Sequence, residues 1–377
     1  GSEMCIRDRY RRVRAATEAF CHPLQIEDYV VQSMPDASPT NWHLAHTTWF
    51  FERFVLHDFE PNFAWVNRVY DHLFNSYYRL VGEPFYRPAR GLITRPTVAE
   101  VMAYRAACDE RLARLLEDVS PDDWRQIRSL IVLGMHHEQQ HQELMVTDLK
   151  HAFSRNPIHP AYHALPAASA PSARDQGLGW IGFEGGARWL GYDGPGFCYD
   201  NETPRHETLL LPFEMADRPV TNAEYLAFIE DDGYVRSEWW LDMAWHAIGS
   251  EGWRQPLYWT RIDGQWMQLT LHGLVPLELD EPATHLSYFE ADAYARWAGA
   301  RLPTEAEWET AAATAPTEGL FADNGRLHPA PAGPADGAAP RQMFGDVWEW
   351  TQSSYGPYPG YQQLPGSLGE YLSLIHI

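Results

Sequence analysis

The chain changes character at a stretch rich in Pro, Ala and Ser, residues 157–177. Before this stretch, apolar residues recur at the three- and four-residue spacing of amphipathic helices. After it, short strand-like runs alternate with turns rich in Gly, Pro and Asp. Because a Pro/Ala-rich composition is typical of linkers, we predict a helical domain over residues 10–156 and a separate α+β domain over residues 178–371.

Helix start signals in the first half indicate four helices. Two Ser-Pro pairs, at Ser38 and Ser120, each place an N-cap before a proline at the first helical position. A capping box begins at Thr97, and another short helix is expected near residues 11–20. Four helices with an apolar stripe each predict a four-helix bundle. The connection over residues 60–96 is long, and such a loop in a compact domain usually carries function.

Charge and composition exclude several classes of protein. The 377 residues carry 29 Lys and Arg against 51 Asp and Glu, and the formal charge of −22 argues against a nucleic-acid partner. No apolar stretch approaches the roughly 20 residues of a membrane helix, so we expect no membrane partner. Four scattered cysteines form no disulfide framework and the first residues show no signal peptide, so we expect a cytoplasmic protein. Residues 1–9 and residues 372–377 are expected to be a non-native leader and tail.

A pair of histidines stands inside the fourth helix, in the string HEQQH. His137 and His141 are four residues apart and continue the apolar stripe, so both imidazoles should face the bundle interior. Buried imidazoles need partners, and a divalent metal would supply one. Gln140 lies on the same side of the helix, while Glu143 and Asp148 are candidates to orient the imidazole ligands.

The second helix offers a third ligand, and spacing alone leaves the choice between His43 and His46 open. Trp42, Trp49 and Phe50 would surround His46 with aromatic rings. Three protein ligands that leave positions open would suit a catalytic metal.

A zinc peptidase is the rival hypothesis. The string HEQQH also matches the motif H-E-x-x-H, in which Glu138 would act as the general base. This hypothesis requires the Glu138 side chain to lie in the cleft beside the zinc.

The long connection carries two further pairs of interest. Tyr77 and Tyr78 can either donate a proton or hydrogen atom at a metal site or simply pack. Arg87 and Arg90, three residues apart, can either hold a carboxylate or lie on a solvated surface.

Five strings, taken in order along the chain, resemble those of the ergothioneine-biosynthetic sulfoxide synthases. They are SPTNWHLAHTTWFFERFVL, FNSYY, HHEQQHQELMVTDLKH, RLPTEAEWE and FGDVWEWT. The resemblance extends over roughly residues 10–371. It implies an α+β protein of two domains, a DinB-like four-helix bundle followed by a domain similar to formylglycine-generating enzyme, which is a variant of the C-type lectin fold.

The resemblance also implies the ligands of an iron site. It points to His46 from the LAH string in preference to His43, and to His137 and His141 from the pattern HxxxHxE. It favours Fe(II) over zinc.

Roles for the other candidate residues follow from the same resemblance. Gln140 would contact the imidazole substrate, and Arg87 with Arg90 would hold the carboxylate of the thiol substrate. Tyr77 and Tyr78 would lie beside the iron, where a tyrosine donates hydrogen.

The implied reaction uses O2. It joins the sulfur of cysteine or γ-glutamylcysteine to C2 of the imidazole of hercynine (Nα-trimethylhistidine) and oxidises the sulfur to a sulfoxide. Three alternatives stay open: a related synthase with a selenium donor, the zinc peptidase, and a non-catalytic module whose lectin-like half binds a ligand.

One departure from the family pattern concerns the end of the chain. The family continues past GEY with an Arg-Gly-Gly-Ser strand and an Arg-Asn-aromatic loop, whereas here LSLIHI follows Tyr371. We therefore expect a second domain that is incomplete at its end and an activity that is weak or absent.

Overall fold

The computed structural model describes residues 3–163, 177–335, 337 and 339–363. The chain forms two compact units, the first built mainly from residues 3–162 and the second from residues 163–362, and each is described by itself. Most of the predicted linker and the whole segment from residue 364 onward, including the expected tail, lie outside the described residues.

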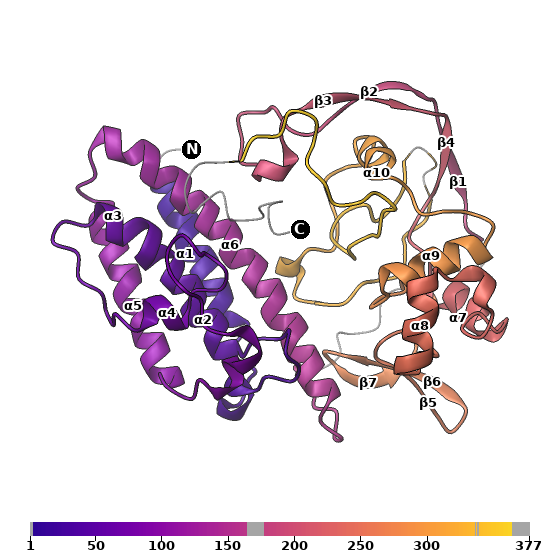
Figure 1. Cartoon of the computed structure of the whole chain (residues 1–377), viewed down its shortest axis with the longest axis horizontal. Coiled ribbons are helices and arrows are strands. Elements are labelled where there is room, and N and C mark those ends of the chain that lie inside the picture. Colours follow the sequence, from indigo (N-terminus) through magenta and orange to yellow (C-terminus); the bar gives the residue numbers. More distant parts are fainter. Residues whose placement is uncertain (1–2, 164–176, 336, 338, 364–377) are drawn as a thin grey trace. The chain divides into compact units, whose positions relative to one another are not determined.

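The first unit is a bundle of helices (Figure 1). Its four long helices among the described residues are α1 (Glu3–Ala19), α2 (Thr40–Phe51), α5 (Val98–Leu115) and α6 (Pro121–Ser154). Helix α2 packs against α5 and α6, and α1 packs against α6. The shorter elements are η1 (Ile26–Val30), η2 (Glu52–Leu56), α3 (His57–Phe59), α4 (Tyr70–Leu73) and η3 (Arg87–Leu92).

Two of the predicted helix starts are observed and a third differs. The hydroxyls of Thr97 and Ser120 accept backbone N–H bonds at the starts of α5 and α6. At α2 the N-cap is Pro39, and the Ser38 hydroxyl instead accepts from the Arg90 guanidinium at 2.9 Å. A tertiary contact therefore replaces the expected cap.

Helix α1 begins at Glu3, inside the segment that was expected to be a leader. Ile6, Tyr10 and Val13 recur at helical spacing and are all buried, so residues 3–9 continue the apolar stripe of the helix.

All twelve residues of α2 are buried. The helix runs directly into the π-helical turn η2, whose Glu52 is also buried and accepts from the Tyr104 hydroxyl at 2.5 Å. π-helical turns occur frequently at functional sites. A helix that is buried on every side places all its polar groups, including two histidines, in the interior.

The second unit combines short antiparallel sheets with short helices. Strand β1 (Trp180–Phe183) pairs with β4 (Phe213–Ala216), and Trp180 lies opposite Ala216. Strand β2 (Gly186–Leu190) pairs with β3 (His206–Leu210). A third sheet has the order β5 (Trp259–Ile262), β6 (Gln265–Thr270), β7 (Gly273–Pro276).

Three helices of the second unit, α7 (Asn222–Glu230), α9 (Tyr288–Trp297) and α10 (Glu305–Ala312), begin at the capping boxes found in the sequence. Helix α8 (Asp242–Glu251) follows Leu241, which provides no side-chain cap. The short elements are η4 (Asp200–Glu202), η5 (Ser237–Trp239) and η6 (Ala322–Asn324). Thr221, Ser287 and Thr304 each cap a helix by accepting the N–H of a glutamate three residues on.

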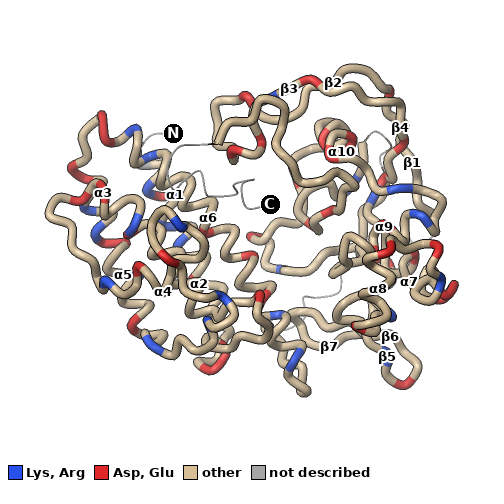
Figure 2. The backbone as a smooth tube through the Cα atoms, in the orientation of Figure 1, with Lys and Arg blue, Asp and Glu red and all other residues tan. Residues whose placement is uncertain are grey.

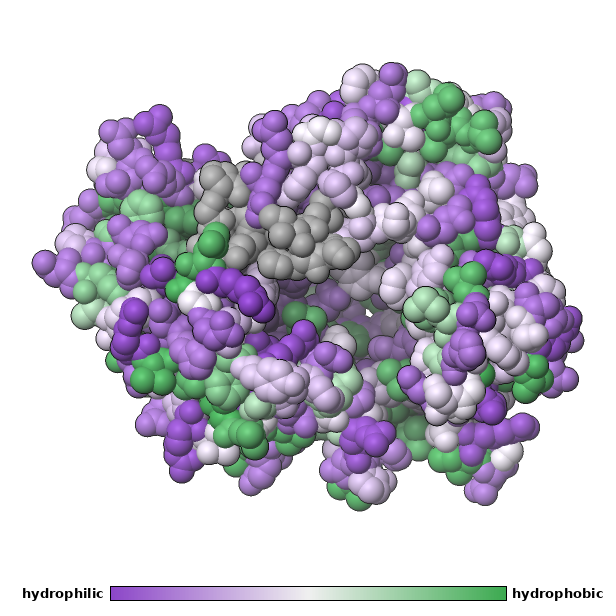
Figure 3. Space-filling model, viewed as in Figure 1, coloured by the Kyte–Doolittle hydropathy of each residue, from purple (hydrophilic) through white to green (hydrophobic). Residues whose placement is uncertain are grey.

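Aromatic rings fill the core of the second unit. Its buried members include Tyr225, Phe228, Tyr234, Trp240, Trp259 and Tyr294. The visible surface of the molecule is mostly hydrophilic with scattered hydrophobic patches (Figure 3). Acidic and basic residues are interspersed along both units (Figure 2). None of the helices in the described ranges has the length and apolar character needed to cross a membrane.

Candidate metal centre

Three buried histidines meet between α2 and α6. His46 of α2 and His137 and His141 of α6 each offer a ligand nitrogen, and these nitrogens lie within 4.8 Å of one another. Nε2 of His46 and Nε2 of His137 are 3.0 Å apart. The structure thus brings together the three histidines that the resemblance implied.

Backbone contact fixes the orientation of His46. Its Nδ1 lies 2.5 Å from the carbonyl oxygen of Phe74. Because a carbonyl oxygen only accepts, the proton of this imidazole sits on Nδ1 and the Nε2 lone pair faces His137.

The long connection supports this face of α2 at two further points. The Trp42 indole N–H donates to the Leu73 carbonyl, and the Trp49 indole N–H donates to the Asp71 carboxylate, both at 3.0 Å. The Trp42 ring stacks on His46 with centroids 4.6 Å apart, and Trp49 lies 5.6 Å from His46. The connection over residues 60–96, which the sequence predicts to carry function, therefore packs beside the three histidines.

His43 lies behind the group instead of in it. Its Nδ1 is 2.9 Å from Nδ1 of His141, and its Nε2 is 3.0 Å from Oδ2 of Asp148. Asp148 was a candidate to orient a ligand, and it reaches His141 through His43. Glu143, the other candidate, is exposed.

Burial keeps the three imidazoles neutral. Desolvation lowers the pKa of His137 to about 3 and holds the pKa values of His46 and His141 well below the usual range. Neutral imidazoles offer lone pairs, and three of them with no thiolate suit several divalent transition metals, including iron and zinc. The donor set therefore fits a metal ion without identifying it.

The two arginines of the RxxR pair occupy different environments. Arg90 is only 3% exposed, and its Cζ lies 3.5 Å from the centroid of the Trp42 ring. Burial, assisted by the charge of Arg87, lowers the pKa of Arg90 to about 9. Arg87 is exposed and donates to the carbonyl of Asp36. One guanidinium of the pair thus stands beside the histidine group.

The tyrosine pair lies one ring away from His46. Tyr78 is fully buried and its ring centroid is 5.7 Å from that of Trp49, which itself stacks on His46. Tyr77 stacks on Tyr78 at 4.5 Å, and the two hydroxyl oxygens are 3.4 Å apart. Gln140 is exposed on α6, next to His141.

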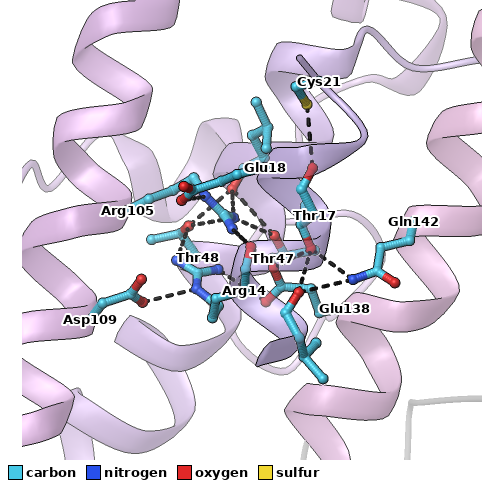
Figure 4. Close-up of polar contacts among 12 residues, drawn as sticks. Arg14, Thr17, Glu18, Cys21, Thr47, Thr48, Arg105, Asp109, Glu138 and Gln142 are labelled. Atoms are coloured by element: carbon cyan, nitrogen blue, oxygen red, sulfur yellow. Dashed lines mark hydrogen bonds and ion pairs between the residues drawn. The ribbon is translucent and has the colours of Figure 1, made fainter. Parts of the chain in front are cut away.

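The Glu138 carboxylate lies among Arg14, Thr17 and Arg105 (Figure 4). Its Oε2 accepts from Arg14 and its Oε1 from Arg105, both at 3.0 Å, and Oε1 also accepts from Thr17 at 2.7 Å. Burial alone would raise the pKa of this carboxyl, but the two guanidinium groups outweigh it and lower the pKa to about 2. Its partners belong to α1 and α5, whereas His137 faces α2.

Comparison with known proteins assigns both halves of the chain. Residues 9–145 match the DinB superfamily, and residues 166–337 match the sulfatase-modifying factor enzyme 1-like domain. The hercynine oxygenase of Mycobacterium tuberculosis is 36% identical over 354 residues, which are 87% of this chain and 79% of that protein. The hercynine oxygenase of Mycolicibacterium smegmatis is 33% identical over 359 residues, 88% of this chain and 78% of that protein.

The chain belongs to the hercynine oxygenase family.

Membership of the hercynine oxygenase family confirms three predictions. The chain is an enzyme that catalyses oxidation, and it joins a DinB-like bundle to a domain like that of formylglycine-generating enzyme. The formylglycine-generating enzyme of Streptomyces coelicolor is 35% identical over 169 residues, 39% of this chain and 52% of that enzyme. The hypothesis of a non-catalytic binding module is therefore wrong.

The zinc-peptidase hypothesis is also wrong for this hercynine oxygenase homologue. A general base must reach a water molecule at the metal. Both oxygens of Glu138 are instead held by Arg14, Arg105 and Thr17 on the far side of the helix.

The charge network around Glu138 is the feature that the sequence did not reveal. A weak signal was present, because Arg105 stands at a buried position in the otherwise apolar stripe of α5. An arginine in such a stripe needs a buried anion, and Glu138 supplies it.

Proposed function

We propose that this protein is a nonheme iron(II), O2-dependent sulfoxide synthase of ergothioneine biosynthesis, acting on small molecules in the cytoplasm. It would join the sulfur of cysteine or γ-glutamylcysteine to C2 of the hercynine imidazole. One O2 oxygen would enter the sulfoxide, and the other would leave as water with the hydrogens of the thiol and of C2. The buried group of three neutral histidines carries the proposal.

His46, His137 and His141 would hold the iron. The iron, when bound, supplies the redox chemistry with O2 and a Lewis-acid site for the thiolate. Neutral imidazole ligands leave its positive charge uncompensated, which favours an anionic sulfur.

Arg90 would bind the carboxylate of the thiol substrate. Its Nε is buried with no hydrogen-bond partner among the described residues, so the guanidinium retains a donor for a ligand. A carboxylate would also restore the charge balance of this buried cation. Arg87, from the same element η3, would contribute from the exposed side.

Gln140 would contact the imidazole of hercynine, and Tyr77 and Tyr78 would donate and receive a proton. The Gln140 amide both donates and accepts, which suits an imidazole. Tyr78 and Tyr77 have hydroxyls within 3.4 Å of each other, so either can receive a proton after the other has donated one.

The decisive experiment loads the full chain with Fe(II) without oxygen, then adds hercynine, cysteine and γ-glutamylcysteine in competition, and O2. We expect the mass of a hercynyl sulfoxide, and its value identifies which of the two thiols is the donor. His46→Ala should abolish metal uptake and product. His136→Ala is the matched control, because His136 adjoins His137 yet contacts Arg9. Tight zinc binding without O2 consumption would refute the proposal.

A further inference from the structure

We infer that Asp148 and His43 are positioning residues that hold His141 in the tautomer whose Nε2 is free to bind a metal. The inference rests on the proposed metal site, and it concerns residues that do not themselves touch the metal.

Three side chains form a continuous line of hydrogen bonds. Oδ2 of Asp148 lies 3.0 Å from Nε2 of His43, and Nδ1 of His43 lies 2.9 Å from Nδ1 of His141. Both histidines are buried, at 4% and 8% exposure, so water does not compete effectively for these nitrogens.

The positions of the protons follow from the acceptor at the end of the line. A carboxylate only accepts, so the first proton lies on Nε2 of His43. With that proton on Nε2, His43 offers the lone pair of its Nδ1, which accepts a hydrogen bond from the Nδ1–H of His141. The remaining nitrogen of His141, Nε2, carries the lone pair that a metal requires.

The reverse arrangement would be incompatible with metal binding. If the proton between the two rings belonged to His43, a neutral His141 would carry its own proton on Nε2. The Asp148 carboxylate requires a proton on Nε2 of His43, which leaves Nδ1 of His43 to accept from His141 and so favours the first arrangement. His46 is held in the equivalent tautomer by the Phe74 carbonyl, so two of the three ligands are oriented from behind.

Asp148 is itself held in place by the start of α2. Its Oδ2 accepts the backbone N–H of Ser38 at 2.8 Å, and the Ser38 hydroxyl accepts from Arg90 at 2.9 Å. The same residues therefore connect the buried guanidinium to the ligand His141. This explains why the Ser38 side chain is not used to cap the helix.

Cobalt(II) binding to the purified full chain tests the inference, with affinity measured by competition against a chelator and geometry followed by visible absorption. Asp148→Asn presents an amide of the same size without the charge, and we expect an affinity loss of about 10–100-fold. His43→Phe keeps a ring but provides no acceptor, and should lose at least as much. His43→Asn places an oxygen near the original Nδ1 and should retain most of the affinity.

Thr147→Ala is the matched control, because Thr147 adjoins Asp148 and its exposed side chain donates to the Glu143 carbonyl of the same helix. It should bind cobalt(II) like the wild type, and thermal unfolding of each metal-free variant shows whether the fold persists. If His43→Phe fails to fold, Asp148→Asn and His43→Asn decide the question.

Nuclear magnetic resonance of the zinc-loaded protein gives a direct readout of the tautomer. Nitrogen signals of His141 should show metal at Nε2 and a proton on Nδ1. Metal at Nδ1, or unchanged cobalt(II) affinity and spectrum in both Asp148→Asn and His43→Phe, would overturn the inference. A wild-type chain that binds no divalent metal would overturn the proposed function as well, so the two failures are distinguishable.

Discussion

Glu138 in the helical unit and Glu349 in the second unit are both shielded from water, yet their pKa values move in opposite directions. Glu138 lies between Arg14 and Arg105, and its pKa falls to about 2. Glu349 accepts from the indole N–H of Trp308, and burial, aided by the nearby Asp346, raises its pKa to about 7. Burial sets the cost of the charge, and a neighbouring cation decides whether the charge persists.

The same contrast extends to the two interiors. The first unit buries the ion network of Glu138 together with a group of imidazoles. The second unit has a core cluster made mainly of aromatic rings, although it also buries carboxylates such as Glu281. We therefore expect substitutions in the first unit to affect chemistry and charge pairing, and those in the second unit to affect packing.

The largest stability effect is expected for Glu138→Gln. It removes the fully buried anion that Arg14 and Arg105 share and leaves them only the more exposed carboxylates of Asp109 and Glu18. Breaking such a buried ion pair costs about 3–5 kcal/mol. Denaturant unfolding measures it, with Asp122→Asn on the exposed surface of the same helix as the control, expected within about 0.5 kcal/mol of wild type. A Glu138→Gln protein as stable as the wild type would show that the ion network is dispensable.

The double variant Tyr77→Phe with Tyr78→Phe tests the proposed proton donation without changing any charged side chain. Loss of a proton donor should reduce sulfoxide formation about a hundredfold, while metal uptake persists. Product is measured by mass spectrometry, and Tyr29→Phe, which removes a hydroxyl bonded to the Cys21 carbonyl, is the control. Unchanged product would remove both tyrosines from the mechanism.

Phe228→Leu tests packing in the second unit. Phe228 is fully buried among aromatic rings, and the smaller side chain should cost about 2 kcal/mol. Metal binding by the first unit should be unaffected, as cobalt(II) titration would show. A parallel loss of metal affinity would mean that the two units are energetically coupled.

The pH dependence should separate the two carboxylates. The folded pKa of Glu349 is raised, so its stabilisation is complete below the unfolded value near 4.5 and is lost as pH rises through about 7. The folded pKa of Glu138 is lowered, so its stabilisation is present above 4.5 and is lost as pH falls toward about 2. Between pH 5 and 8 the wild type should lose on the order of 1 kcal/mol of its free energy of unfolding through Glu349. Glu349→Gln should remove this loss when unfolding is measured across pH. A slope that persists in this variant would assign the loss to other groups.

Local features of the fold were predictable because they depend on residues a few positions apart. The capping boxes at Thr97, Thr221, Ser287 and Thr304 join residues three positions apart, and each is present in the structure. The shared face of His137 and His141 follows from the pitch of one helix. The change of composition at residues 157–177 lies where the chain divides into two compact units.

Contacts between distant segments were not predictable in this way. His43 and His46 are three residues apart on one buried helix. Only the way α2 packs against α6 places His46 with His137 and His141, and His43 behind His141. The partners of Glu138 are 33, 121 and 124 residues away in sequence.

The sequence by itself determined the two-domain organisation, the helix starts marked by capping boxes and the histidine pair, because these depend on periodicity and on neighbouring residues. Only the tertiary structure decided which way each buried polar group points. The direction depends on which helix packs against which face, and on whether a cation or a carbonyl group lies within hydrogen-bond distance on that face.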